Sequence, residues 1–397
     1  MASSATAYLD QEWLRELVTD LAGIERESGS PGELEAAEWV AARLGEHGAV
    51  AAIETERQHS TYWWPLGLAG LAGALAGGTS LRGHRAAGFV LGSAAAYAAA
   101  TDMPPGRRLL RQILPKGNAS NVVAFAGAPD AERTVVLVAH HDAAHSGLVF
   151  DPRIPELADR AGLIEDASTS PPLMWPIIGG PAGVALGSLI GSRLLTRAGA
   201  VVSAGFAAAM VDIGLRAVVP GANDNATGVA VLVALARALA ERPTERTRVM
   251  LVSTSEEDLC QGMEAFGRRH FPELPVESTF IMSVDTVGSP HLCVLRGEGM
   301  RGMREYPQRS LALVDRLADE LGIHLYPGLR LRNATDGCIP LAHGYECASL
   351  ASVTALKQPA NYHWPTDVPE NVDYATVADA ARLAEALVRR LDDHWLD

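Results

Sequence analysis

Residues 135–142, Val-Val-Leu-Val-Ala-His-His-Asp, decide the fold of this chain. An unbroken apolar run that contains three valines is typical of a buried strand. His140, His141 and Asp142 follow at once, so side chains that can bind a metal stand at the end of that strand. Active sites of open α/β sheets lie at the carboxyl ends of their strands. The stretch therefore predicts an α/β protein with a site at that edge of its sheet.

The composition limits the function classes that need to be considered. The 397 residues are 48% hydrophobic, which is enough for one large or two modest domains with real cores. A net charge of −14 without a long run of Lys or Arg argues against nucleic acid as a partner. Four dispersed cysteines indicate neither a disulfide scaffold nor a thiolate metal site. Cys338 and Cys347 could pair in an oxidising compartment, but two free buried thiols are favoured.

Helical and strand patterns alternate along the chain. Apolar residues recur at helical spacing early and late in the sequence, and short β-branched runs lie between them. The expected helices are 13–24, 33–44, 229–241 and 374–391, and the expected strands are 50–53, 121–125, 134–138, 248–253 and 280–284. This order predicts an α/β fold with a mixed, largely parallel central sheet flanked by helices, built as one catalytic domain over residues 1–397.

Two apolar segments, residues 60–101 and 167–211, interrupt this pattern and predict inserted helical hairpins. Residues 60–81 and 167–192 carry no formal charge and reach the length that can cross a bilayer. Glycines recur every fourth residue, which predicts close helix contacts through small side chains at Gly73/Gly77, Gly88/Gly92 and Gly179/Gly183/Gly187/Gly191. We expect membrane association, with a soluble four-helix appendage as the alternative.

The N-terminus and the end of the second hairpin refine the expected location. The first fifteen residues have neither a basic start nor an apolar run of signal-peptide length, so we expect a cytoplasmic catalytic domain, on a membrane or soluble. A carboxylate at bilayer depth is costly, so we expect Asp212 at the membrane edge beside Arg216, one helical turn away.

Further carboxylates and imidazoles follow in a definite order. In His140-x-Asp142, the histidine can offer one ring nitrogen to a metal while the aspartate accepts the N–H of the other. Asp224 stands in the turn Asn-Asp-Asn-Ala-Thr-Gly before an apolar helix, at residues 223–228. Glu256 and Glu257 close a buried strand, where adjacent carboxylates need a cation or a raised pKa. Asp285 ends another strand, and the late loop 362–367 holds His363 and Asp367.

In this order the five elements resemble the M28 family of metallopeptidases, the co-catalytic zinc aminopeptidases and their relatives. The resemblance runs from about residue 11 to the C-terminus, outside the two hairpins. It implies that Asp224 bridges two metals, that His140 and Asp285 complete one site, and that Glu257 and His363 complete the other. Glu256 would be the general base and Asp142 the second catalytic residue, which orients His140.

The resemblance also implies the cofactor and the reaction. Two Zn²⁺ ions, with Mn²⁺ or Co²⁺ as alternatives, would hold a hydroxide that attacks the peptide bond. The function expected is that of a zinc exopeptidase of the aminopeptidase type, acting on peptides. A carboxypeptidase, a single-zinc glutaminyl cyclase and a non-catalytic binding module on the same fold stay open, as does a homo-oligomer. Asn223, where relatives often have an acidic residue, and Asp336-Gly337, where they commonly have Asp-His, depart from the family pattern.

Overall fold

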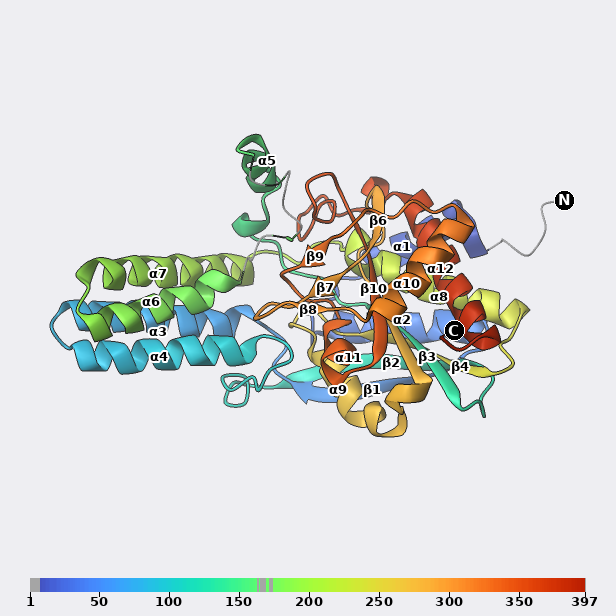
Figure 1. Ribbon diagram of the computed structural model, residues 1–397, viewed down its shortest axis with the longest axis horizontal. Helices are drawn as coiled ribbons and strands as arrows, with labels where there is room; N and C mark the ends of the chain where they lie inside the picture. The colour runs from blue at the N-terminus through green and yellow to red at the C-terminus, as the bar shows by residue number, and fades with distance from the viewer. Residues whose placement is uncertain (1–7, 163, 165–168, 171–173, 397) are drawn as a thin grey trace.

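The computed structural model describes residues 8–162, 164, 169–170 and 174–396. A seven-stranded sheet with the order β1-β2-β4-β3-β5-β10-β6 lies at its centre (Figure 1). Its strands are β1 (Val50–Gln58), β2 (Gly117–Gly127), β3 (Arg133–His140), β4 (Thr247–Thr254), β5 (Thr279–Val284), β6 (His291–Val294) and β10 (Glu346–Val353).

The middle of this sheet is parallel and its edges are antiparallel. Parallel pairing joins β4, β3, β5 and β10, whereas β1, β2 and β6 are held by antiparallel pairing. All five expected strands belong to the sheet, and the predicted mixed α/β fold is confirmed. β6 and β10 are additions that the β-branched pattern does not predict.

Helices flank the sheet as expected. The almost completely buried α8 contacts β2, β3 and β4, and α1, α2 and α12 pack on α8. The expected helices correspond to α1 (Gln11–Ala22), α2 (Pro31–Glu46), α8 (Thr227–Glu241) and α12 (Tyr374–Asp393). The remaining elements of this part are α5 (Arg153–Arg160), α9 (Gln261–His270), α10 (Gln308–Leu321), α11 (Cys338–His343) and a small sheet of β7 (Gly297–Glu298), β8 (Arg304–Glu305) and β9 (Arg330–Leu331). All four cysteines are free and buried, as favoured.

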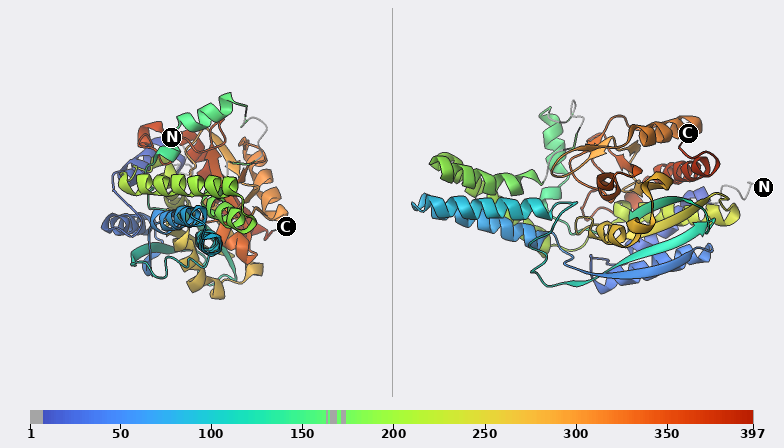
Figure 2. Two further views of the ribbon diagram at one scale, coloured as in Figure 1. Left: turned by 90° about the vertical axis from the view of Figure 1, so that its left-hand side faces the viewer. Right: turned by 60° about the horizontal axis from the view of Figure 1, so that its bottom comes forward.

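A four-helix bundle projects from this α/β part (Figures 1 and 2). It consists of α3 (Trp63–Leu81), α4 (Arg85–Asp102), α6 (Trp175–Ile190) and α7 (Arg193–Leu215). The first hairpin packs on the second, because α3 contacts α6 and α7 and α4 contacts α6. The expected start of the second hairpin at residue 167 lies outside the described residues. The division into a catalytic domain and two insertions stays a prediction.

Small residues let the bundle helices approach closely. A Cβ atom on Gly92 would lie 3.0 Å from the Pro181 carbonyl oxygen, and one on Gly187 would lie 2.6 Å from the Thr196 nitrogen. Gly73, Gly77 and Gly88 are equally confined. The predicted small-residue contacts are therefore present at these glycines. Gly179 faces open space and Gly191 ends α6 in the left-handed region, so the four-residue repeat overstates the contact surface.

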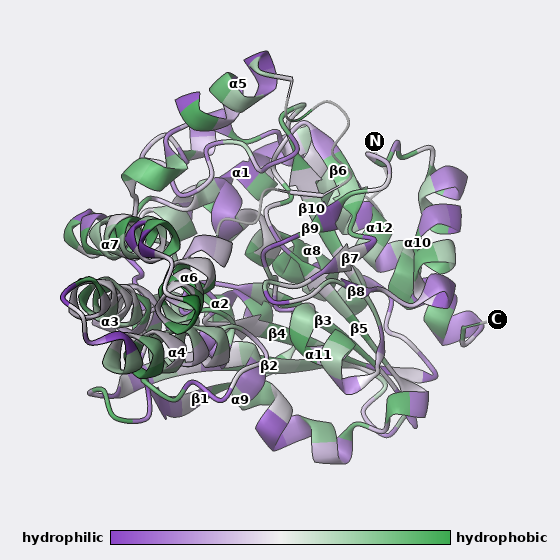
Figure 3. Cartoon of the chain, turned by 60° about the vertical axis from the view of Figure 1, so that its left-hand side comes forward, coloured by the Kyte–Doolittle hydropathy of each residue, from purple (hydrophilic) through white to green (hydrophobic). Residues whose placement is uncertain are grey.

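The bundle helices consist largely of apolar residues, as the hydropathy colouring in Figure 3 shows, and many of these side chains are exposed. Exposed side chains include Leu75, Leu189, Leu194, Val201 and Leu215. Of the helices in the described ranges, α7 alone is long and apolar enough to cross a bilayer, and only 22% of its 18-residue apolar window is buried.

Charged residues of the bundle gather at its ends. Arg82, Arg85, Arg193 and Arg197 lie at the tip, where the Arg85 guanidinium donates to the carbonyl oxygens of Ser188 and Leu189 at 2.9 Å each. At the base, Asp212 pairs with Arg216 as expected, with 3.0 Å between Asp212 Oδ1 and Arg216 Nε. The long apolar stretch between these ends is almost free of charge.

Candidate metal centre

Three parallel strands deliver polar residues to one edge of the sheet. β3 ends at His140, β4 is followed by Glu256 and Glu257, and β5 is followed by Asp285. Since neighbouring parallel strands run in the same direction, their carboxyl ends bring these side chains together.

A loop that is held from both sides brings Asp224 to the same edge. The buried guanidinium of Arg26 donates to the carbonyl oxygens of Pro220 and Gly221, both at 2.6 Å. The Asp367 carboxylate accepts hydrogen bonds from the backbone N–H groups of Asn223 at 2.7 Å and Asp224 at 3.1 Å. These contacts fix the backbone of the turn, so that the Asp224 side chain reaches the strand ends.

The two oxygens of Asp224 face two different histidines. Oδ1 lies 3.2 Å from His140 Nε2, and Oδ2 lies 3.3 Å from His363 Nε2. Asp285 Oδ1 is 3.8 Å from His140 Nε2, and Glu257 Oε2 is 3.4 Å from His363 Nε2. The structure thus forms two groups that share Asp224, each with ligand atoms within 4.8 Å of one another. All five residues predicted to bind metal lie in these two groups.

Asp142 connects the strand end of β3 to the loop after β4. Its Oδ1 lies 3.1 Å from His140 Nδ1 and accepts a hydrogen bond from the Glu256 N–H at 2.9 Å. Its Oδ2 accepts from the Glu257 N–H at 3.0 Å and from the Ser28 hydroxyl. Burial acts to raise the pKa of Asp142, but the hydrogen bonds from His140, Ser28 and Glu256 hold it below the usual value. An ionised Asp142 can therefore orient His140.

Glu256 and Glu257 point to different partners although they are adjacent. Glu257 joins the group of His363, whereas Glu256 Oε2 lies 3.5 Å from His140 Nε2 and belongs to neither three-residue group. Burial raises the pKa of Glu256 well above its usual value, and the nearby Asp285 adds to this effect. One carboxylate of the pair therefore belongs to a candidate ligand group and the other does not.

The site concentrates negative charge around its imidazoles. Burial acts to lower the pKa of His363, but Glu257 and Asp224 raise it to about 10. The same carboxylates together with Glu256 and Asp285 surround a buried space, where charges without compensation are costly. Such a donor set of imidazole and carboxylate groups suits a divalent cation.

His363 has no counterpart of Asp142 among the described residues, and aromatic rings pack against its imidazole instead. The His363 ring stacks on Tyr362, with ring centres 3.9 Å apart, and meets the edge of Phe150 at 4.5 Å. Among the residues that the structure describes, no group bonds the buried His363 Nδ1. The two groups thus differ in how their histidine is oriented.

Some residues near the site are not found by sequence reasoning. Arg26 positions the turn that holds Asp224, and Tyr62 at the start of α3 lines a cavity beside Glu257. Asp367, which the sequence placed in the late loop, also holds the backbone of this turn. Asp336, where the family pattern left a substrate contact in doubt, is buried and accepts a hydrogen bond from the Thr254 hydroxyl. The neighbouring Asn333 lines the site and donates to the Tyr362 hydroxyl at 3.0 Å.

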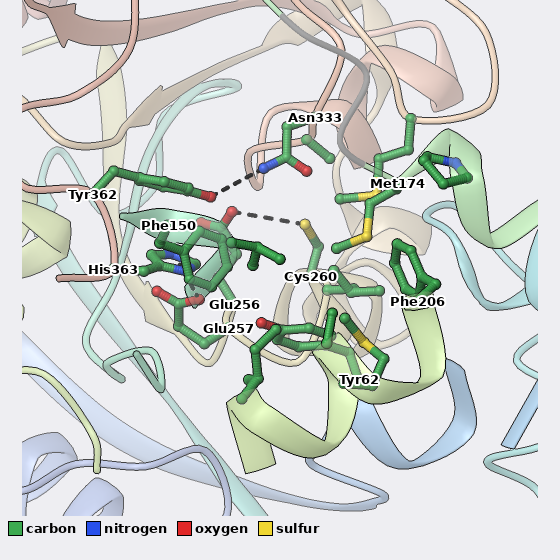
Figure 4. Close-up of a pocket in the computed structure, with 18 of the residues that line it drawn as sticks. Tyr62, Phe150, Met174, Phe206, Glu256, Glu257, Cys260, Asn333, Tyr362 and His363 are labelled. Carbon is green, nitrogen blue, oxygen red and sulfur yellow. Dashed lines mark hydrogen bonds and ion pairs between the residues drawn. The ribbon is translucent and has the colours of Figure 1, made fainter. Parts of the chain in front are cut away.

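Two cavities meet at Glu256, Glu257 and His363. The smaller, about 120 Å³, also reaches His140, Asp224 and Asp285. The larger, about 310 Å³, extends to the base of the bundle and appears in Figure 4.

Residues 207–388 match the sequence model of Peptidase family M28. This segment contains Asp224, Glu256, Glu257, Asp285 and His363 and begins after His140. A search of the curated proteins finds no match to the chain.

Solved structures resemble the whole chain at low sequence identity. An aminopeptidase from Aneurinibacillus sp. strain AM-1 has 15% identity and a TM-score of 0.57, with 97% of this chain and 94% of that chain covered. A Zn-dependent exopeptidase from Parabacteroides distasonis has 12% identity and a TM-score of 0.56, with 96% and 98% covered. A glutaminyl cyclase from Bacteroides thetaiotaomicron has 12% identity and a TM-score of 0.55, with 96% and 97% covered. These likenesses confirm the zinc-exopeptidase fold, and the family match confirms the resemblance to M28.

Proposed function

Because residues 207–388 match the model of Peptidase family M28, we propose that the chain is a two-zinc exopeptidase of the aminopeptidase type. The observation that carries this proposal is the placement of Asp224, whose two carboxylate oxygens face His140 and His363 separately. A carboxylate shared by two imidazole-containing groups can hold a pair of neighbouring divalent cations.

The distances between donor atoms fit zinc. Four ligand atoms placed tetrahedrally at about 2.1 Å from Zn²⁺ lie about 3.4 Å from one another. The nitrogen-to-oxygen separations in the two groups are 3.2 and 3.8 Å around His140, and 3.3 and 3.4 Å around His363. His140, Asp224 and Asp285 would hold one ion, and Asp224, Glu257 and His363 the other. Mn²⁺ and Co²⁺ accept the same donors.

The residues of the chain then have distinct tasks. Such a metal pair, when bound, supplies activated water and stabilises the negative charge that develops on the substrate carbonyl. Glu256 accepts the proton of the attacking water and transfers it to the leaving amine, for which its raised pKa is suitable. Asp142 keeps His140 in the required orientation and holds the backbone of both glutamates.

Metal content and cleavage assays test the proposal together. We expect two zinc ions per chain by mass spectrometry of metals, and cleavage of free peptides but not of N-acetylated ones. Preferential cleavage from the carboxyl end would instead favour a carboxypeptidase. One zinc with cyclisation of N-terminal glutamine would favour the glutaminyl cyclase alternative, and metal binding without turnover would favour a binding module.

The bundle supports a proposal about location. Its exposed surface is apolar along α3, α4, α6 and α7, while its interior is filled by small residues that suit packing in lipid. Beside its base, Arg57, Arg107, Lys116 and Arg268 line a shallow pocket of about 220 Å³. Basic residues close to an apolar insertion favour an anionic membrane surface. We therefore place the bundle in a bilayer and the α/β part at its surface.

Membrane extraction tests this location. The full chain should sediment with membranes, resist alkaline carbonate and bind vesicles with anionic lipid more strongly than neutral vesicles. If the protein stays fully soluble without detergent, the bundle is instead a soluble four-helix appendage. The cytoplasmic side and a homo-oligomer stay predictions.

A further inference from the structure

The larger cavity is built jointly by the bundle and the α/β part. On its bundle side, α7 contributes Val202, Phe206, Met210 and Ile213. On the other side, Leu259 and Met300 complete an apolar lining that ends at Glu256, Glu257 and His363 (Figure 4). We call this 310 Å³ space the bundle chamber. The bundle is therefore a wall of the reaction site as well as a candidate membrane element.

The position of the chamber assigns it to one end of the substrate. The smaller cavity of about 120 Å³ reaches both groups of candidate ligands, so it suits the terminal residue with its amine and scissile carbonyl. The chamber borders the site at Glu257, His363 and Glu256, the residue that would protonate the leaving amine, but it does not reach His140, Asp224 or Asp285. The part of the peptide that follows the scissile bond therefore extends into the chamber.

Resting on the proposed aminopeptidase function, we propose that the bundle chamber binds the second residue of the substrate and selects large apolar side chains there. The apolar lining favours leucine, phenylalanine or tryptophan, because each removes apolar area from water on binding. Aspartate at this place would lose hydration and would face the carboxylates Glu256 and Glu257 instead of a group of opposite charge.

Tyr62 provides a polar contact inside this apolar space. Its side chain is 3% exposed, and its hydroxyl has no hydrogen-bond partner among the described residues. Figure 4 shows the ring beneath the cavity with the hydroxyl end turned toward Glu257. A buried hydroxyl without a partner is unfavourable unless a ligand satisfies it. In the proposal, Tyr62 donates to a backbone carbonyl oxygen of the residue in the chamber.

The first test compares dipeptides with the zinc-loaded full chain. Ala-Phe and Ala-Leu should exceed Ala-Gly and Ala-Asp in kcat/KM by roughly 10–100-fold, as expected for burying one large apolar side chain. Leu-Gly serves as the comparison for the first residue. Equal kcat/KM values for Ala-Phe and Ala-Gly would overturn the proposal.

A pair of glycine variants tests the location of this selectivity. A Cβ on Gly205 meets no atom within 4 Å, and Gly205 lines the chamber, so Gly205→Phe places a large side chain there without moving the backbone. This variant should reduce the Ala-Phe to Ala-Gly ratio toward one. Gly179 is equally open but lies on α6 outside the chamber lining, so Gly179→Phe should keep the ratio. An unchanged ratio in Gly205→Phe would also overturn the proposal.

Binding of the product amino acids tests the proposed selectivity of the chamber independently of the proposed peptidase function. If no dipeptide is hydrolysed, the proposed function fails, and calorimetry with phenylalanine and glycine still tests the chamber. Phenylalanine should bind at least about 10-fold more tightly, and Gly205→Phe should remove the difference. Equal binding of the two amino acids would contradict the chamber.

Tyr62→Phe tests the polar contact. Since no described residue bonds the hydroxyl, its removal should leave the melting temperature unchanged or higher, while kcat/KM falls about 3–10-fold for both Ala-Phe and Ala-Gly. A lower melting temperature with unchanged kcat/KM would assign Tyr62 a structural role instead.

Discussion

The α/β part and the bundle place their apolar side chains in opposite ways. In the α/β part, large side chains such as Leu14, Leu137 and Phe266 are completely buried. In the bundle, most buried residues are glycine, alanine or serine, with large buried side chains such as Leu66 and Ile177 among them, while many leucine and valine side chains face outward. The first arrangement removes apolar area from water, while the second depends on close contact between helix backbones.

This difference extends to charge and chemistry. The α/β part buries Arg26, Asp142 and Asp224 around the candidate metal centre, where Arg26 donates to backbone carbonyl groups and Asp142 accepts from the N–H groups of both glutamates. The bundle is almost free of charge between its arginine tip and the Asp212–Arg216 pair at its base. Buried polar side chains in defined positions are thus a feature of the α/β part, and exposed apolar side chains are a feature of the bundle. The two regions meet at the bundle chamber.

The largest expected effect comes from Asp224, on the polar side of this comparison. Asp224→Asn keeps the shape of the side chain but removes the charge that both ligand groups share. We expect loss of both zinc ions and of measurable turnover. Metal analysis after dialysis, with circular dichroism to check the fold, measures this. A variant that keeps two ions would contradict the bridging role.

Glu256→Gln is expected to have the second largest effect, and it distinguishes metal binding from proton transfer within the same site. Glu256 lies in neither three-residue ligand group, so both ions should stay bound. Loss of the general base should lower kcat by about 10²–10⁴-fold. Steady-state kinetics with parallel metal analysis decides the matter, and nearly normal kcat would exclude Glu256 as the base.

Asp142→Asn is expected to have an intermediate effect. The amide can still meet His140, but it cannot accept all the hydrogen bonds that Asp142 receives from Ser28, Glu256 and Glu257. Substitutions of this kind lower metal affinity by about 10–100-fold. Zinc titration should show the weakening first in the His140 group. Complete loss of that ion, equal to His140→Ala, would mean that Asp142 is itself a ligand.

Much of the fold follows from sequence patterns, and the exceptions have physical causes. Strands β3, β4 and β5 are apolar and rich in branched side chains, so they are evident. β10 reads Glu-Cys-Ala-Ser-Leu-Ala-Ser-Val, with small residues that lack the usual strand signal. Its place between β5 and β6 is a tertiary effect. β6 has only four residues, too few for a periodicity to show.

The candidate ligands could be predicted because each stands at a strand end or a turn in a recognisable order. The role of Asp142 beside His140 could be predicted as well. The other contacts that hold the site could not, because they join residues that are distant in the chain. Arg26 reaches carbonyl groups 194 and 195 residues later. Asp142 accepts from N–H groups 114 and 115 residues later. Tyr62, an aromatic residue before an apolar helix, has the pattern of a core residue.

The smallest expected effect concerns the bundle and tests whether its packing is independent of the metal centre. A Cβ on Gly92 would lie 3.0 Å from the Ala185 nitrogen and the Pro181 carbonyl oxygen, both backbone atoms that cannot move alone. Gly92→Leu must therefore separate α4 from α6, and overpacking of this kind costs about 1–3 kcal/mol. Gly183→Leu should be milder, since its Cβ meets the Gly199 Cα at an ordinary 3.5 Å.

Gly179→Leu is the matched control, because its Cβ meets no atom within 4 Å. Thermal unfolding in detergent should rank the variants Gly92→Leu, Gly183→Leu and Gly179→Leu from the largest loss to the smallest. Zinc content should stay normal in all three, since none of these glycines contacts the ligand groups. Equal melting temperatures for Gly92→Leu and Gly179→Leu would show that close backbone contact does not hold the bundle together. Loss of zinc in Gly92→Leu alone would show that the bundle also positions the candidate metal centre, and the two regions could then no longer be treated as separate.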